Sequence, residues 1–173
     1  MAGQGYVQVY TGHGKGKTTA MLGLVLRAAG AGLKVYIGQF LKNMEYSEIK
    51  AIKNHLPMVE VEQYGQGYSL DDRISMEDVQ TAAMGLEKAT QAMLSGKYDV
   101  IALDEVNMAV LLGFVSKEAL LELISKKPYG IELILTGRYA MPEIVAAADL
   151  VTEMCEVKHY YNTGVTAREG IEL

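Results

Sequence analysis

The sequence predicts an α/β protein whose mostly parallel sheet is flanked by helices. Short apolar runs alternate with helical patterns along the chain, and this alternation is typical of a parallel sheet with helices on both faces. The best strand runs are apolar at nearly every position, as expected of strands that are buried on both sides. The 173 residues contain no linker, repeat or low-complexity segment, so we expect one domain spanning residues 1–173.

The expected elements follow one another in a regular order. Helical patterns cover residues 18–29, a long stretch that starts at Ser75, residues 117–126 after the cap Ser116, and residues 143–148 after Pro142. The irregular segment 41–75 allows two interpretations: a functional loop, or a helix and an edge strand with weak patterns. Six runs are expected to be strands: residues 6–10, 34–40, 59–63, 99–103, 131–136 and 150–157.

Composition and charge narrow the classes of function. The formal net charge is −5, which argues against a nucleic-acid partner because such proteins need a basic surface. The N-terminus lacks the pattern of a signal peptide and the apolar runs are too short to span a bilayer, so we expect a cytoplasmic protein without membrane contact. The single cysteine, Cys155, has the apolar neighbours Val151 and Met154. We therefore expect a core or near-core thiol and no intrachain disulfide.

A glycine-rich segment, TGHGKGKT at residues 11–18, lies between the first expected strand and the first expected helix. It ends as the phosphate-binding pattern G-x-x-x-x-G-K-[ST] does, although Thr11 replaces the first glycine. Glycines let backbone N–H groups turn toward phosphate oxygens, and the start of the helix adds its positive dipole end. Lys17 supplies a mobile positive charge, and Thr18 supplies a hydroxyl for Mg²⁺. The segment therefore predicts a site for a nucleoside triphosphate at Gly12, His13, Gly14, Lys15, Gly16, Lys17, Thr18 and Thr19.

Two carboxylates, Asp104 and Glu105, follow the apolar strand at residues 99–103. The carboxyl ends of parallel strands face the ligand crevice of such sheets, and an acidic residue at this place holds Mg²⁺ in phosphate-loop proteins. We therefore expect Thr18, Asp104 and Glu105 to bind the metal. Which of the two carboxylates contacts it stays open at this point.

Four blocks, TGHGKGKTT at 11–19, QFLK at 39–42, LDEVN at 103–107 and LTGR at 135–138, resemble the ATP:corrinoid adenosyltransferases. The tail at 157–171, VKHYYNTGVTAREGI, is similar to the C-terminal signature of that family. The resemblance covers nearly the whole chain, and its blocks stand in the family's order. It implies the recombinase-like variant of the phosphate-loop fold, a homodimer, and an electron-donating flavoprotein as a partner.

The resemblance also implies a reaction. The cobalt of a reduced cob(I)alamin or precursor corrinoid attacks the 5′ carbon of ATP, and inorganic triphosphate leaves. Lys17 and Glu105 are then the expected catalytic residues, because the protein must position the reactants and stabilise the departing charge. Arg27 matches a family arginine near the nucleotide. Arg138, after an expected strand, either faces the nucleotide or is a surface arginine.

The corrinoid-binding residues implied by the resemblance are Tyr68 and Leu70. In the family, aromatic side chains of this segment displace the lower axial ligand of the corrinoid. Tyr68 keeps an aromatic ring, whereas Leu70 falls where a tryptophan can occur, and this chain has no tryptophan. Tyr68 as a half-buried loop anchor is the alternative.

Two other functions fit part of the pattern. A general phosphate-loop ATPase or kinase would need only the glycine-rich segment, and it would cleave between the β and γ phosphates. An ATP-dependent carrier of finished adenosylcobalamin would bind the same ligands without turnover of free corrinoid.

Overall fold

A computed structural model describes residues 3–65 and 75–173, and within them six parallel strands form one sheet. The strand order is β3-β2-β4-β5-β1-β6, and every neighbouring pair is parallel. The expectation of a parallel sheet is therefore confirmed. The strands are β1 (Val7–Thr11), β2 (Val35–Phe40), β3 (Val59–Tyr64), β4 (Val100–Asp104), β5 (Glu132–Thr136) and β6 (Leu150–Glu153).

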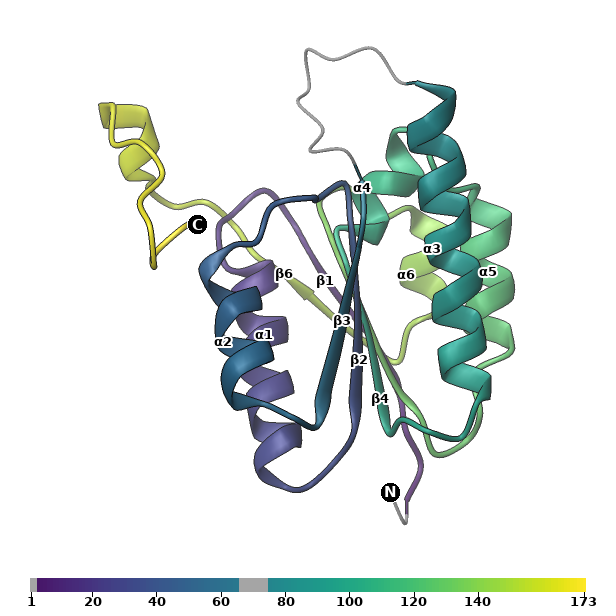
Figure 1. Cartoon of the computed structure of the whole chain (residues 1–173). Coiled ribbons are helices and arrows are strands. Elements are labelled where there is room, and N and C mark those ends of the chain that lie inside the picture. The colour runs from purple at the N-terminus through teal and green to yellow at the C-terminus, as the bar shows by residue number, and fades with distance from the viewer. Residues whose placement is uncertain (1–2, 66–74) are drawn as a thin grey trace.

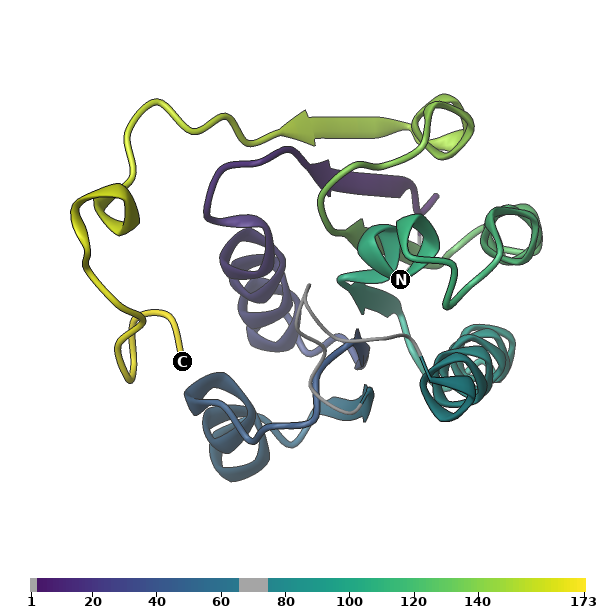
Figure 2. The same ribbon diagram turned by 90° about the horizontal axis from the view of Figure 1, so that it is seen from above.

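Helices cover both faces of the sheet (Figures 1 and 2). On one face lie α1 (Lys17–Gly30) and α2 (Ser47–His55), and on the other lie α3 (Met76–Leu94), α4 (Val106–Leu111), α5 (Lys117–Ser125) and α6 (Pro142–Ala147). A short 3₁₀ helix, η1 (Tyr160–Thr163), lies in the C-terminal tail. Side chains of the central strands belong to two hydrophobic clusters, one on each face of the sheet. In β4, Ile101 and Leu103 pack on the α3 side, whereas Val100 and Ala102 pack on the α1 side. This alternation explains why the strand is apolar throughout.

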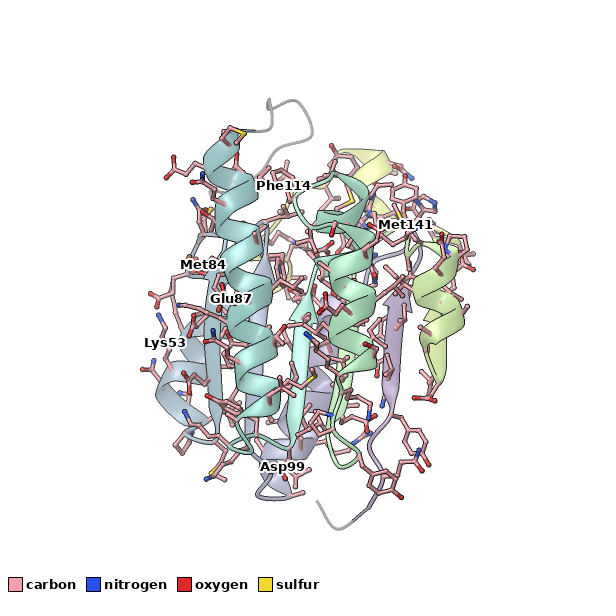
Figure 3. All side chains as sticks on the ribbon, turned by 90° about the vertical axis from the view of Figure 1, so that its right-hand side faces the viewer. Lys53, Met84, Glu87, Asp99, Phe114 and Met141 are labelled. Atoms are coloured by element: carbon pink, nitrogen blue, oxygen red, sulfur yellow. The ribbon has the colours of Figure 1, made fainter. Side chains whose placement is uncertain are left out.

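The caps of two helices form as the sequence predicts. The Ser75 hydroxyl accepts a hydrogen bond from the Asp78 N–H at 3.1 Å, and the Asp78 carboxylate accepts one from the Ser75 N–H at 3.1 Å. This reciprocal arrangement satisfies two N–H groups at the start of α3. The Ser116 hydroxyl caps α5 through the Ala119 N–H. Figure 3 shows this side of the molecule, where Met84 and Glu87 lie on the solvent side of α3.

The segment 41–75 follows the second of its two interpretations as far as residue 64. Residues 47–55 form α2, whose buried residues are Ile49 and Ile52, and residues 59–64 form the edge strand β3. The six-residue helix α4 was not predicted, because it is short and starts directly behind the carboxylate pair. Within the described part of the chain, every helix is too short or too polar to cross a membrane.

The last strand is shorter than predicted, and the expectation for Cys155 is wrong. β6 ends at Glu153 instead of residue 157, and all of its residues are exposed. It lies at the edge of the sheet, and among the described strands it pairs only with β1. The chain has left the sheet by Cys155, so the thiol is exposed. Apolar neighbours in the sequence do not imply burial here, because the residues of this edge strand are themselves exposed.

Candidate active site

The glycine-rich loop at residues 12–16 joins β1 to α1 and packs against the residue that follows β6. Gly12 and Gly16 have φ angles of 93° and 122°, a region that other residues adopt only at a cost. The Gly14 N–H donates to the Met154 carbonyl at 2.7 Å. A Cβ atom on Gly14 would lie 2.8 Å from that carbonyl oxygen. Gly14 is therefore required for a close backbone contact, and its N–H is committed to the protein rather than to a ligand.

The start of α1 completes the loop. The first N–H groups of a helix have no partner within it, and Gly16 at the N-cap offers no side-chain acceptor. These groups and the helix dipole favour an anion at this place. Lys17, Thr18 and Thr19 open the helix, which begins near Lys17 as the sequence predicts.

The side chain of Lys17 folds back over the loop. Its ammonium donates to the carbonyls of Gly12 at 2.9 Å and Gly14 at 2.8 Å, and the residue is only 6% exposed. Burial lowers the pKa of Lys17, and Arg138 acts in the same direction, whereas Glu105 opposes the shift. The Lys17 ammonium is thus bonded to neutral carbonyl groups of the loop, and a bound anion would give it a partner of opposite charge.

Asp104, at the end of β4, is completely buried and accepts four hydrogen bonds. Its Oδ1 atom accepts from the hydroxyls of Thr18 at 2.9 Å and Thr136 at 2.7 Å. Its Oδ2 atom accepts from the Gln39 amide at 3.2 Å and the Lys42 ammonium at 2.7 Å. The carboxylate thus ties the start of α1 to the carboxyl ends of β2 and β5.

Glu105 follows with a left-handed backbone, φ 58°, at the N-cap of α4. Its N–H donates to the Thr136 hydroxyl at 3.0 Å, and its side chain faces the cavity described below. Burial raises its pKa and the charge of Asp104 adds to this, whereas Lys42, Lys17 and Arg138 oppose it. The turn therefore places the Glu105 carboxylate close enough to Lys17, Lys42 and Arg138 for their charges to act on it.

A cavity of about 710 Å³ opens between the loop, α2 and the C-terminal tail. Figure 2 shows the tail curving from β6 past the start of α1 toward α2. Here the Lys15 ammonium lies 3.5 Å from the Glu172 carboxylate. The cavity is lined by Gly14, Lys15, Gly16, Lys17, Thr18, Thr19, Leu22, Lys42, Tyr46, Ser47, Glu48, Ala51, Glu105, Arg138, His159, Gly170, Ile171, Glu172 and Leu173.

Some residues expected at the site are not among the cavity's described lining residues. The His13 ring packs edge-on against Tyr139, with centroids 4.7 Å apart. Gly12, the first residue of the loop, is buried. Arg27 is exposed near the end of α1, ten residues beyond Lys17 and thus about 15 Å along the helix. Asp104 acts from beneath the cavity through its hydrogen bonds. The corrinoid-contact residues expected at Tyr68 and Leu70 lie outside the described residues.

Several residues of the site carried no predicted role. Lys42 and Gln39 belong to the block QFLK, which we recognised only as a resemblance. His159 and Glu172 come from the tail, more than 140 positions from the loop in sequence, and isolated side chains of this kind give no local pattern. The resemblance of the two segments pointed to Gln39, Lys42 and His159. Glu172 lies one residue beyond the matched tail at 157–171, and no signal in the sequence pointed to it.

Comparison with known proteins agrees with this geometry. Residues 3–173 match the family model described as "ATP:corrinoid adenosyltransferase BtuR/CobO/CobP". A corrinoid adenosyltransferase of Pseudomonas aeruginosa is 32% identical over 171 residues, which cover 98% of this chain and 84% of that protein. One from Sinorhizobium is 33% identical over 173 residues, covering 98% and 81%.

Among solved structures, a KaiC-like protein from Pyrococcus horikoshii shares the fold with a TM-score of 0.59. The sequences are 16% identical, and the match covers 90% of this chain and 75% of that one. This likeness confirms the recombinase-like phosphate-loop architecture, and the match to the family model identifies the enzyme class. The chain therefore belongs to the ATP:corrinoid adenosyltransferase family, whose enzymes transfer the adenosyl group of ATP to a corrinoid.

Proposed function

We propose that the 710 Å³ cavity holds the triphosphate of ATP while the cobalt of a reduced corrinoid attacks the 5′ carbon. The electron pair of cobalt(I) forms the cobalt–carbon bond. The bond between that carbon and its oxygen breaks, and its electrons leave with inorganic triphosphate. The observation that carries the proposal is the loop at the carboxyl edge of the sheet, with the Lys17 ammonium folded over it.

The chain's own residues act on the leaving group. Lys15, Lys17, Lys42 and Arg138 all line the cavity, so four cations surround the place where triphosphate charge develops. Preorganised charge of this kind stabilises a transition state because it needs no rearrangement during the reaction. Substrate cobalt(I) is itself a strong nucleophile, so no activated side-chain nucleophile is needed.

The chain also offers oxygen ligands for a Mg²⁺ ion that is bound together with phosphate. Among the described residues, no three His, Cys, Asp or Glu side chains are grouped as a metal site. Mg²⁺ usually binds through one or two carboxylates, substrate phosphates and water. Thr18 and Glu105 supply a hydroxyl and a carboxylate at the cavity wall, and Asp104, hydrogen-bonded to Thr18, supplies a second carboxylate beneath it. An ion held there would neutralise phosphate charge.

We further propose that Tyr68 and Leu70 contact the corrinoid. The resemblance motivates this assignment. The described ends of their segment support it, because Tyr64 ends β3 at the carboxyl edge of the sheet and Ser75 precedes α3. Tyr68→Ala should impair turnover with a protein reductant more than turnover with chemically supplied cobalt(I). Equal losses in both assays would limit Tyr68 to a structural or positioning role.

A homodimer, a flavoprotein electron donor and a cytoplasmic location also belong to the proposal. Exposed apolar side chains on the edge strand and in the segment after it support self-association: Leu150 and Val151 on β6 are 44% and 40% exposed, and Val157 is 97% exposed. Sedimentation at several protein concentrations tests the dimer. The comparisons do not favour the general ATPase, the kinase or the carrier.

Incubation with ATP, Mg²⁺ and chemically reduced cobalamin tests the reaction. Visible absorbance should show a new cobalt–carbon bond, and phosphorus NMR should show one intact triphosphate for each bond formed. Omission of corrinoid should abolish ATP loss. If ADP and phosphate accumulate without corrinoid and no triphosphate forms, the chain is an ATPase.

A further inference from the structure

The carboxylate of Asp104 has no spare acceptor site. A carboxylate offers about four lone-pair positions, and Asp104 accepts from Thr18, Thr136, Gln39 and Lys42. The residue is also completely buried. A metal ion, or water bound to it, can therefore approach an Asp104 oxygen only when one of the four donors moves away.

Two of the four donors are held in place by a second hydrogen bond. The Gln39 side-chain oxygen accepts from the Gln63 amide at 3.0 Å, and the Thr136 hydroxyl accepts from the Glu105 N–H at 3.0 Å. Gln39 and Thr136 are both fully buried. Neither can leave Asp104 without stranding a buried polar group, which is costly.

The other two donors, Thr18 and Lys42, both line the cavity. Thr18 is short and fixed to the first turn of α1. The Lys42 side chain is long, flexible and 20% exposed, and its ammonium also lies 5.8 Å from the centre of the Tyr46 ring. Lys42 is therefore the donor that can exchange partners across the cavity.

The backbone of Lys42 is fixed although its side chain can move. Leu41 has a left-handed φ of 61°, a strained conformation that persists only where its surroundings impose it. The Leu41 N–H donates to the Tyr64 carbonyl at 3.0 Å. A Cβ atom on Gly65 would lie 2.7 Å from the Lys42 nitrogen. The segments that follow β2 and β3 are therefore in close backbone contact. The Lys42 side chain can therefore change its position while its backbone stays in place at the cavity wall.

We propose that Lys42 is an exchangeable counterion, whose ammonium moves from Asp104 Oδ2 to the phosphate oxygens as a triphosphate enters. Asp104 Oδ2 then becomes available to the metal ion that accompanies the triphosphate. Lys42 thereby joins Lys17 in neutralising the leaving group. The inference rests on the proposed function insofar as the ligand is a triphosphate.

This exchange makes the metal and the anion respond to Lys42 in opposite directions. The ammonium competes with a divalent cation for Asp104, so removing its charge should strengthen binding of metal alone. The same ammonium attracts phosphate, so removing it should weaken binding of the anion alone. A lysine that only supports the fold would affect both in the same direction.

Two binding measurements without turnover test the proposal. Calorimetry with inorganic tripolyphosphate in EDTA reports the anion, and the EPR signal of free Mn²⁺ reports the metal in phosphate-free buffer. For Lys42→Gln we expect the tripolyphosphate Kd to rise about tenfold or more, as for loss of one hydrogen bond to a charged group. The Mn²⁺ Kd should fall. Lys53→Gln is the matched control, because Lys53 is an exposed lysine of α2 paired with Glu45 at 2.6 Å, and neither Kd should change.

Asp104→Asn provides a second variant if Lys42→Gln does not fold. Releasing Lys42 from its carboxylate should strengthen metal-free tripolyphosphate binding. Weakening of both ligands by Lys42→Gln, no change in either, or no gain of anion affinity in Asp104→Asn would overturn the exchange. If wild-type protein itself does not bind tripolyphosphate, the proposed function fails as well, so the two failures are distinguishable.

Discussion

Two carboxylates contact residues that line the cavity, Asp104 from beneath it and Glu172 from its wall, and they are held in different ways. Asp104 is buried, and its donors come from the start of α1, the carboxyl ends of β2 and β5, and the loop after β2. Glu172 lies in the tail, and its partners are the tail residues Arg168 and Tyr160 together with Lys15 of the loop. The first arrangement depends on the packed core. The second lies near the surface, where the side chains of Arg168 and Lys15 are 50% and 40% exposed and that of Glu172 is 15% exposed. We expect perturbations of the core side to have large effects and perturbations of the tail to have small ones.

The largest effect should come from the cation on the core side of the loop. Lys17→Ala should lower the rate of cobalt–carbon bond formation by about 10²–10³, the typical loss for one preorganised electrostatic contact. Lys15→Ala is the control, because the Lys15 side chain is 40% exposed and contacts the tail, and its loss should be smaller. A Lys17 variant within about threefold of wild type, far below the expected loss, would exclude this role.

Removing the buried carboxylate should affect both stability and metal dependence. Asp104→Asn leaves the Lys42 ammonium without its partner, which should lower the free energy of unfolding by about 3 kcal/mol. Denaturant titration measures this change. The Mg²⁺ concentration required for activity should rise in Asp104→Asn and in Glu105→Gln. If both variants keep the wild-type metal dependence, the metal site lies elsewhere.

A smaller effect is expected where the loop meets the start of the tail. Gly14→Ala places a Cβ atom 2.8 Å from the Met154 carbonyl oxygen, which should cost about 1–3 kcal/mol of unfolding free energy. Gly23→Ala is the control, because a Cβ atom there meets nothing within 4 Å and alanine favours a helix. Thermal unfolding should separate the two variants. Equal stabilities would mean that the tail moves aside without cost.

The smallest effect should come from the tail carboxylate, and it should depend on pH. Hydrogen bonds from Arg168 and then Tyr160 lower the pKa of Glu172 from 4.5 to about 2. Because the folded pKa lies below the unfolded one, the stabilisation is present above about pH 4.5 and is lost as the pH falls toward 2. Between these values the melting temperature of wild type should fall slightly more steeply than that of Glu172→Gln. Parallel curves would show that the tail contact does not contribute to stability.

The elements that follow strong local patterns were predictable from sequence. The central strands are apolar because both faces are covered, and the loop at residues 12–16 carries its glycines because the backbone requires them. The start of α3 at Ser75 was also predictable, because the residues that form its cap are three positions apart in the chain. In each case the residues that determine the structure are neighbours in the chain.

The features that local patterns do not reveal depend on contacts between distant segments. Lys42 lies 62 positions from Asp104 in sequence. No local pattern therefore shows that its ammonium donates the fourth hydrogen bond to the Asp104 carboxylate. The assignment of Arg27 to the nucleotide rests on the resemblance and stays a prediction, because the helical rise places Arg27 about 15 Å from Lys17 along α1. Cys155 has apolar neighbours, but its burial depends on what covers the edge strand β6. Sequence patterns describe the elements well and the contacts between their ends poorly.

The position of the C-terminal residues has a practical consequence for protein engineering. Leu173 lines the cavity, so any tag or fusion partner joined after it begins at the cavity wall. Gly5, by contrast, pairs with Tyr129 just before β5, at the opposite end of the strands (Figure 1). An affinity tag or fluorescent reporter for purified protein therefore belongs at the N-terminal side. A spectroscopic probe attached at the C-terminal side would instead report directly on what occupies the cavity.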